Sequence, residues 1–230
     1  MFSRLLNSLR GAEGHFDRER EAYERLRTRG YAPAAIVDVG AYEGHWTRNT
    51  RGVFGDVPVL MVEPQEAKAA ALERLCAELA GVRLAQHVLA ARAGETVIFY
   101  EMETGSSLMP ERSDAPRREV RHTTETLDAI APAADNLFLK IDAQGAELEI
   151  LKGGEATLAR CSLVQLEAAV ARYNEGAPSL REVLRFMEER GFRMLDIAGR
   201  SRIQGHLVQI DVLFVPEGSP LLRDHFIFER

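Results

Sequence analysis

The sequence has few cysteines, no long hydrophobic run and no excess of positive charge. Only two of its 230 residues are cysteines, and neither Cys76 nor Cys161 belongs to a CxxC pair or adjoins a histidine. Two isolated thiols are typical of a reducing compartment and give no support to a zinc or redox site. No stretch approaches the roughly 18 apolar residues of a membrane-spanning helix, and arginines interrupt the apolar residues of the first ten positions. We therefore expect a cytoplasmic protein without a transmembrane segment or a secretory signal.

The net charge of −6 argues against a nucleic-acid partner, because proteins that bind nucleic acids usually carry a basic patch. The one arginine-dense stretch, residues 112–121, also contains Asp114 and Glu119. We interpret this stretch as a solvated loop.

Short β-branched runs alternate with helical patterns along most of the chain. The pattern predicts strands at residues 35–40, 59–63, 82–89, 96–100, 137–142 and 162–168, and helices at 45–53, 65–79, 147–160 and 180–190. Two final strands, 192–197 and 208–215, are expected to be antiparallel and joined by a polar turn. Such alternation indicates a Rossmann-like α/β domain, residues 35–230, with a mainly parallel sheet covered by helices on both faces. Residues 1–34 are expected to form an N-terminal helical segment, and residues 2–29 could make a homodimer contact.

Polar residues lie at the carboxyl ends of five of the predicted strands. They are Asp38 with Gly40, Glu63, His87, Asp142 and Glu167. Ligands of parallel sheets bind at the carboxyl ends of the strands. Acidic side chains directly after apolar runs are costly to bury and need partners. We therefore expect the ligand site at this edge of the sheet.

The loop after the first predicted strand favours a nucleoside without phosphates. Gly40 allows a tight turn and Gly44 allows close approach at the helix start. Tyr42 occupies the position where a dinucleotide-binding loop has the glycine that admits a pyrophosphate, and the sequence contains no P-loop. Glu63 ends the next strand, where a carboxylate can accept hydrogen bonds from both ribose hydroxyls. Each glycine taken alone would indicate no more than a turn.

Residues 139–153, LKIDAQGAELEILKG, resemble the signature of FkbM-type methyltransferases, and so do residues 37–41. That family usually has Asn where this chain has Tyr42. Shorter matches occur in the family's order at Glu63-Pro64 and at residues 106–108, 126–128, 166–167 and 190–192. The similarity extends over residues 36–215. It implies a seven-stranded class I methyltransferase fold with an antiparallel C-terminal strand, S-adenosylmethionine as the methyl donor, and O-methylation of a sugar, glycan or natural-product hydroxyl.

The resemblance and the strand-end rule together assign roles to particular residues. We expect Asp38 to support the loop of Gly40, Ala41 and Gly44 and to contact the amino-acid end of the cofactor. Glu63 and Pro64 are assigned to the ribose, and His87 and Val88 to the adenine. Asp142 is the first candidate for the general base or for orienting the acceptor hydroxyl, and Glu167 is the second.

Residues 102–121 lack periodicity and contain several Gly, Ser and Pro residues. Loops of this length are usually functional or disordered. Because it precedes the fourth core strand, we predict a lid over the cofactor or acceptor, with Ser107 as a contact.

Several of these assignments have structural alternatives. Asp142 and Glu147 could cap a helix, and Lys140 is better explained by a structural ion pair than by a catalytic amine. His87 could be an ordinary partly buried histidine. A divalent metal held by Asp142, Glu167 and a histidine is left open, although no metal motif is present. The whole chain could also be an oxidoreductase, or a non-catalytic nucleoside-binding or scaffolding module.

Overall fold

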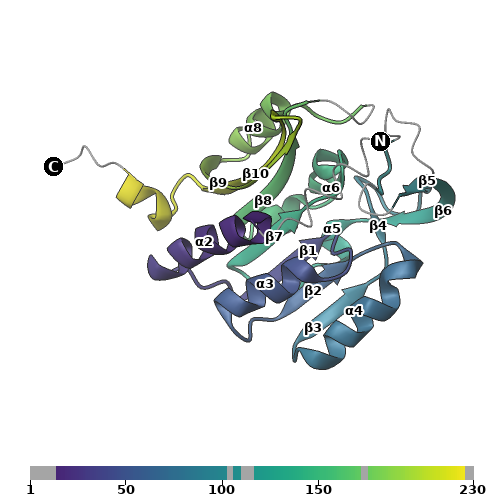
Figure 1. Cartoon of the computed structure of the whole chain (residues 1–230), viewed down its shortest axis with the longest axis horizontal. Coiled ribbons are helices and arrows are strands. Elements are labelled where there is room, and N and C mark those ends of the chain that lie inside the picture. The colour runs from purple at the N-terminus through teal and green to yellow at the C-terminus, as the bar shows by residue number, and fades with distance from the viewer. Residues whose placement is uncertain (1–13, 103–105, 110–116, 172–175, 226–230) are drawn as a thin grey trace.

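A seven-stranded sheet forms the centre of the computed structural model, which describes residues 14–102, 106–109, 117–171 and 176–225 (Figure 1). The strand order is β3-β2-β1-β7-β8-β10-β9. The strands are β1 (Ala35–Val39), β2 (Val59–Val62), β3 (Val82–Ala85), β7 (Leu137–Ile141), β8 (Cys161–Ala169), β9 (Phe192–Ile203) and β10 (His206–Pro216). Only β10 is antiparallel to its neighbours β8 and β9 within this sheet. The predicted fold class, a mainly parallel sheet with an antiparallel C-terminal strand, is confirmed.

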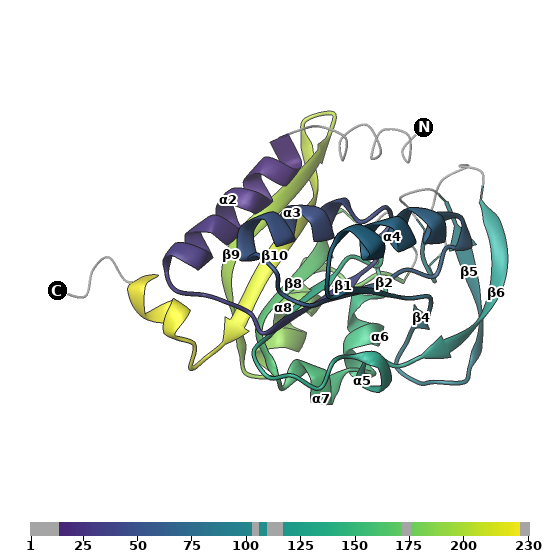
Figure 2. The same ribbon diagram turned by 90° about the horizontal axis from the view of Figure 1, so that it is seen from below.

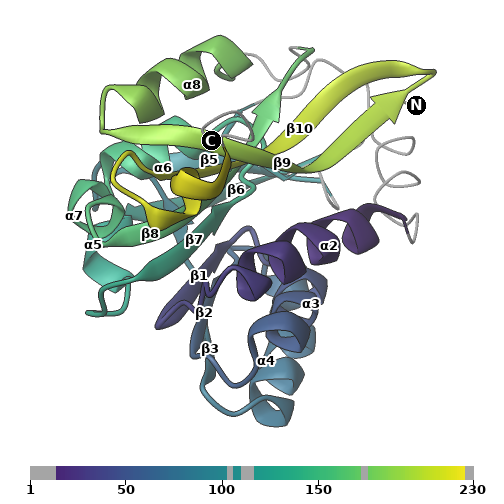
Figure 3. The same cartoon turned by 90° about the vertical axis from the view of Figure 1, so that its left-hand side faces the viewer.

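Helices cover both faces of the sheet (Figures 2 and 3). The helices α2 (Gly14–Thr28), α3 (His45–Phe54) and α4 (Glu66–Glu78) lie on one face. The helices α5 (Leu127–Ile130), α6 (Glu147–Lys152), α7 (Glu155–Leu158) and α8 (Leu180–Glu188) lie on the other face. A short 3-10 helix, Pro220–His225, follows β10. No helix among the described residues is both long enough and apolar enough to span a bilayer.

Strand β1 has neighbours on both sides and helices on both faces, and all five of its residues are therefore buried. Its side chains alternate between two hydrophobic cores, one under α6 and α8 and the other under α2, α3 and α4. The second core contains an aromatic cluster in which the rings of Tyr23 and Trp46 each lie 5.5 Å from that of Phe138, edge to face. This cluster anchors α2 and α3 to the centre of the sheet.

The predicted third strand is divided between two sheets. Residues Val82–Ala85 pair with β2 as β3, whereas β4 (Val88–Leu89) belongs to a separate three-stranded sheet of order β4-β6-β5. The strand expected at 96–100 is β5 (Thr96–Glu101). Its partner is β6 (Arg118–Glu125), so the prediction of a solvated loop is wrong for residues 118–121. Pairing with β5 and the β-branched residues of β6 outweigh its charged composition.

The predicted helix over residues 147–160 is interrupted by Gly153 and Gly154, which separate α6 from α7. A Cβ atom on Gly153 would lie 2.2 Å from the carbonyl oxygen of Ala90, and one on Gly154 would lie 2.6 Å from the side chain of Leu127. The two glycines therefore allow other parts of the chain to approach the backbone closely at this break.

Candidate active site

A cavity of about 540 Å³ opens at the carboxyl ends of β1, β2, β7 and β8. This volume lies within the range of small-molecule sites. Its described lining is acidic and includes Glu19, Glu43, Glu63, Asp142, Glu167 and Asp211. Lys140 is the single Lys or Arg among the described lining residues. The cavity thus suits a ligand that carries positive charge better than one that carries phosphates.

The loop between β1 and α3 is shaped by glycines with positive φ. Gly40 has φ +74°, and a Cβ there would lie 2.0 Å from the carbonyl oxygen of Asp142. Gly44 has φ +78°, and its Cβ would lie 2.4 Å from the side chain of Leu75 in α4. The first glycine therefore holds the loop against the end of β7, and the second allows α3 to pack against α4.

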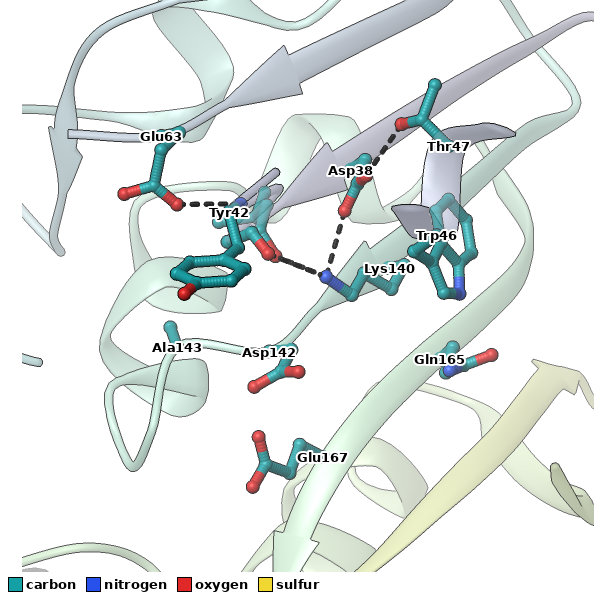
Figure 4. Close-up of polar contacts among 12 residues, drawn as sticks. Asp38, Tyr42, Trp46, Thr47, Glu63, Lys140, Asp142, Ala143, Gln165 and Glu167 are labelled. Atoms are coloured by element: carbon teal, nitrogen blue, oxygen red, sulfur yellow. Dashed lines mark hydrogen bonds and ion pairs between the residues drawn. The ribbon is translucent and has the colours of Figure 1, made fainter. Parts of the chain in front are cut away.

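Glu63 is joined to this loop by its carboxylate (Figure 4). The backbone N–H of Tyr42 donates to Oε2 at 2.8 Å, and that of Gln65 donates to Oε1 at 3.0 Å. Burial raises the pKa of Glu63, and the two N–H donors partly oppose this shift. Each carboxylate oxygen keeps acceptor capacity beyond these bonds. Glu63 lines the cavity and is therefore placed to accept hydrogen bonds from a vicinal diol.

Asp38 and Lys140 form a buried ion pair beneath the loop, with Nζ 2.8 Å from Oδ1 (Figure 4). Nζ also donates to the carbonyl oxygens of Val39 and Gly40, at 3.1 and 3.0 Å. The second oxygen of Asp38 accepts from the Thr47 hydroxyl at 2.7 Å. The structural interpretation of Lys140 is therefore the one that the geometry supports.

Asp38 is fully buried and does not line the cavity. The contacts of Asp38 with Lys140 and Thr47 position the glycine loop, and its direct contact with a cofactor stays a prediction.

The carboxylates of Asp142 and Glu167 both line the cavity and lie beside each other (Figure 4). The side-chain amide of Gln144 donates to both, at 2.8 Å to Asp142 Oδ1 and 2.5 Å to Glu167 Oε2. Gln144 has φ +54°, in the left-handed region that β-carbon-bearing residues rarely adopt. A residue held in this conformation between two cavity carboxylates is typical of a functional site.

Glu147 shapes the loop that carries Asp142 and Gln144. Its Oε1 accepts the backbone N–H groups of Ala143 and Gly145, both at 3.0 Å. Burial raises the pKa of Glu147 to about 7, although these bonds oppose the shift. The N-cap of α6 is Ala146, so the capping alternative does not apply to Asp142.

The cavity brings together most of the residues predicted from the sequence. Its lining includes Gly40, Ala41, Glu63, Pro64, His87, Val88, Asp142 and Glu167. His87 is exposed, which does not fit the alternative of a partly buried structural histidine. Gly44, at the end of the loop, is not among the lining residues and packs against α4.

Ser107 is also outside the lining, and its ligand contact stays a prediction. Its hydroxyl donates to the carbonyl oxygen of Gln144 at 2.9 Å and accepts the N–H of Met109 at 2.9 Å. Its neighbours Ser106 and Leu108 line the cavity instead. Ser107 thus anchors this segment to the loop that carries Gln144.

The predicted lid, residues 102–121, is only partly described by the structure. Residues 103–105 and 110–116 lie outside the described part, and residues 118–121 belong to β6. Closure of a lid remains a prediction.

The comparisons with known proteins identify the family. The sequence model described as the methyltransferase FkbM domain matches residues 38–194, well over half of the chain. The chain belongs to this family. A search of curated proteins finds no match.

Solved structures of S-adenosylmethionine-dependent methyltransferases share the fold of this FkbM-domain protein. One is such an enzyme from Clostridium acetobutylicum, with a TM-score of 0.56 and 8% identity over 94% of this chain and 98% of the other. Another is magnesium protoporphyrin IX methyltransferase from Synechocystis with bound S-adenosylmethionine, with a TM-score of 0.53 and 9% identity over 88% and 80%. A third is ribosomal protein L11 methylase from Lactobacillus delbrueckii, with a TM-score of 0.51 and 12% identity over 90% and 80%. Family and fold together support an S-adenosylmethionine-dependent methyltransferase.

The donor set of the cavity fits S-adenosylmethionine. Glu63 offers acceptors for the ribose hydroxyls, and Val88, Leu89 and Phe99 supply apolar surface beside it for a base. The acidic lining complements a sulfonium and an ammonium group. The one lysine is committed to Asp38 and to loop carbonyls. Within the described part of the chain, no group of three His, Cys, Asp or Glu side chains is arranged to hold a metal ion.

Several lining residues were not found from the sequence. Glu19 comes from α2, Gln165 from β8, and Gln209 and Asp211 from β10. Glu19, Gln209 and Asp211 lie outside the segment that matches the FkbM model. Gln165 and Glu167 alternate on β8, so a period-two count from Glu167 would have found Gln165. No local signal points to Glu19.

Proposed function

We propose that the protein transfers the methyl group of S-adenosylmethionine to a hydroxyl group of a sugar, glycan or natural-product acceptor. The observation that carries the proposal is the pair of cavity carboxylates, Asp142 and Glu167, held by one amide beside the glycine loop. A paired carboxylate is suited to orient a hydroxyl group and to accept its proton.

Bound S-adenosylmethionine supplies a methyl group on a positively charged sulfur, which is already an activated leaving group. The task of the protein is therefore to place the acceptor oxygen in line with the methyl carbon. We assign Glu63 to the ribose, the backbone around Gly40 and Ala41 to the amino-acid end, and His87 with Val88 to the adenine. These residues line one continuous cavity with Asp142.

Asp142 accepts the proton of the acceptor hydroxyl as the oxygen–carbon bond forms. The carbon–sulfur bond breaks at the same time, and its electron pair stays on sulfur. Glu167 accepts a second hydrogen bond from the acceptor and, through Gln144, fixes the carboxylate of Asp142. Transfer to the hydroxyl therefore leaves the proton on Asp142.

The substitution Asp142→Asn tests this assignment. General base catalysis is worth roughly 10²–10⁴-fold in rate, so we expect kcat to fall by at least about 100-fold. Affinity for S-adenosylhomocysteine, measured by calorimetry, should change little. Asp135→Asn, on an exposed loop residue, is the matched control and should retain full activity. Full turnover in Asp142→Asn would end the proposal for this residue.

A further inference from the structure

Glu19 is a buried carboxylate that the proposed transfer step does not use. It lies on α2, yet it is only 2% exposed and lines the cavity. Its Oε2 atom is buried and has no hydrogen-bond partner among the described residues. An unsatisfied buried carboxylate oxygen is costly and is usually explained by a ligand or a catalytic role.

A chain of hydrogen bonds fixes the orientation of Glu19. The indole N–H of Trp46 donates to the Tyr23 hydroxyl at 2.9 Å, and that hydroxyl donates to Gln165 Oε1 at 2.5 Å. The amide of Gln165 then donates to Glu19 Oε1 at 2.8 Å. One oxygen of Glu19 is therefore held by Gln165, while Oε2 is buried without a hydrogen-bond partner among the described residues.

The surroundings of Glu19 are acidic on several sides. Burial raises the pKa of Glu19 most, Asp211 on β10 raises it further, and Asp142 adds to the effect. Together these causes raise this pKa to about 8, whereas Lys140 opposes the shift. Lys140 is already bonded to Asp38. Apart from Lys140, the described lining residues include no Lys or Arg.

The register of the sheet places these groups side by side. Gln165 of β8 is paired with Lys140 of β7, and Glu167 of β8 is paired with Asp211 of β10. Because alternate residues of a strand share a face, Gln165 and Glu167 project to the same side, where Gln165 meets Glu19. Glu19, Asp211 and the Asp142–Glu167 pair thus border one cavity.

We propose that Glu19, Gln165 and Asp211 form an acceptor subsite that binds the protonated amino group of a hydroxylated acceptor, of the amino-sugar class. This inference rests on the proposed function, because it takes Asp142 as the place of transfer. The ammonium group donates to Oε2 of Glu19 and orients a neighbouring hydroxyl toward Asp142. A carboxylate or phosphate on the acceptor would face these acids with no uncommitted Lys or Arg among the described lining residues.

The test is calorimetry on the protein saturated with S-adenosylhomocysteine, with glucosamine, glucose and glucuronate as probes. We expect glucosamine to bind roughly tenfold or more tightly than glucose, which is the size of a hydrogen bond to a charged group. Glucuronate should bind more weakly than glucose. Failure of glucosamine to bind, equal affinity for glucose, or tighter binding of glucuronate would overturn the subsite.

Single substitutions test which side chains produce the preference for glucosamine over glucose. Glu19→Gln should lower glucosamine affinity roughly tenfold and leave glucose affinity unchanged. Glu21→Gln changes an exposed residue of the same helix and should alter neither. Asp211→Asn provides a second variant, from a different element, and should also reduce the preference for glucosamine. An unchanged preference in both Glu19→Gln and Asp211→Asn contradicts the proposal.

Proton release gives a readout that a structural role would not produce. An ammonium group beside Glu19 favours its ionised form, so glucosamine should displace a proton from the wild type near neutral pH. Calorimetry in two buffers of different ionisation enthalpy measures this release, and the difference from Glu19→Gln cancels the titration of the sugar itself. No difference between the two proteins contradicts the subsite. Loss of S-adenosylhomocysteine binding by the wild type would instead contradict the proposed function.

Discussion

The ion pair beneath the glycine loop allows a quantitative prediction for Lys140→Met. The lysine side chain is 6% exposed and that of Asp38 is 0% exposed, so the substitution leaves a buried carboxylate whose remaining donor among the described residues is the Thr47 hydroxyl. Removal of one partner from a buried pair costs about 3–5 kcal/mol. Whole domains have free energies of unfolding of about 5–15 kcal/mol. We therefore expect a large fall in the urea midpoint at neutral pH.

The double variant Asp38→Asn/Lys140→Met separates this cost from the loss of packing. With both charges removed, the remaining loss is that of the bonds to the carbonyls of Val39 and Gly40, about 1 kcal/mol each. The double variant should therefore be more stable than the single one. Lys152→Met removes an exposed lysine paired with Glu149 and should change stability by less than about 1 kcal/mol. A loss of under about 1 kcal/mol in Lys140→Met, or a double variant no more stable than the single, would refute the reasoning.

Three further predictions concern the cavity. Glu63→Gln replaces a charged acceptor by a neutral one, so affinity for S-adenosylhomocysteine by calorimetry should fall roughly tenfold, whereas the exposed Glu66→Gln should leave it unchanged. Gly40→Ala introduces a Cβ at 2.0 Å from a carbonyl oxygen at positive φ, so its melting temperature and cofactor affinity should both fall; a wild-type melting curve would contradict the packing. The pKa of Glu19 is raised from 4.5 to about 8, so the native state binds more protons than the unfolded state between these two pH values. The contribution of Glu19 to the free energy of unfolding should therefore be fully present below about pH 4.5 and decline as the pH rises through about 8. Glu19→Gln should remove up to about 1.4 kcal/mol per pH unit of this decline in urea titrations, and parallel pH profiles for the two proteins would contradict it.

The core of the fold could be predicted from the sequence because parallel strands buried on both faces appear as continuous apolar runs. The runs at β1, β2 and β7 ended at Asp38, Glu63 and Asp142, and the strand-end rule then brought these residues to one edge of the sheet. The strand-end rule could not predict which of these acidic side chains would line the cavity and which would be buried away from it. Asp38 lies inside β1 and Glu63 directly follows β2, and of these two only Glu63 lines the cavity.

The parts that were missed depend on contacts between distant segments. The arginine-rich residues of β6 form a strand because β5 pairs with them. Ser107 was predicted to contact a ligand, but its hydroxyl donates to the backbone carbonyl of Gln144, 37 residues further along the chain. Glu19 lies 146 residues before its partner Gln165, and only the packing of α2 brings them together.

A crystal structure with S-adenosylhomocysteine tests the central claim most directly. We expect both ribose hydroxyls within hydrogen-bond distance of the Glu63 carboxylate, with the sulfur directed toward Asp142 and Glu167. A nucleoside bound elsewhere, or a sulfur directed away from these two carboxylates, would contradict it.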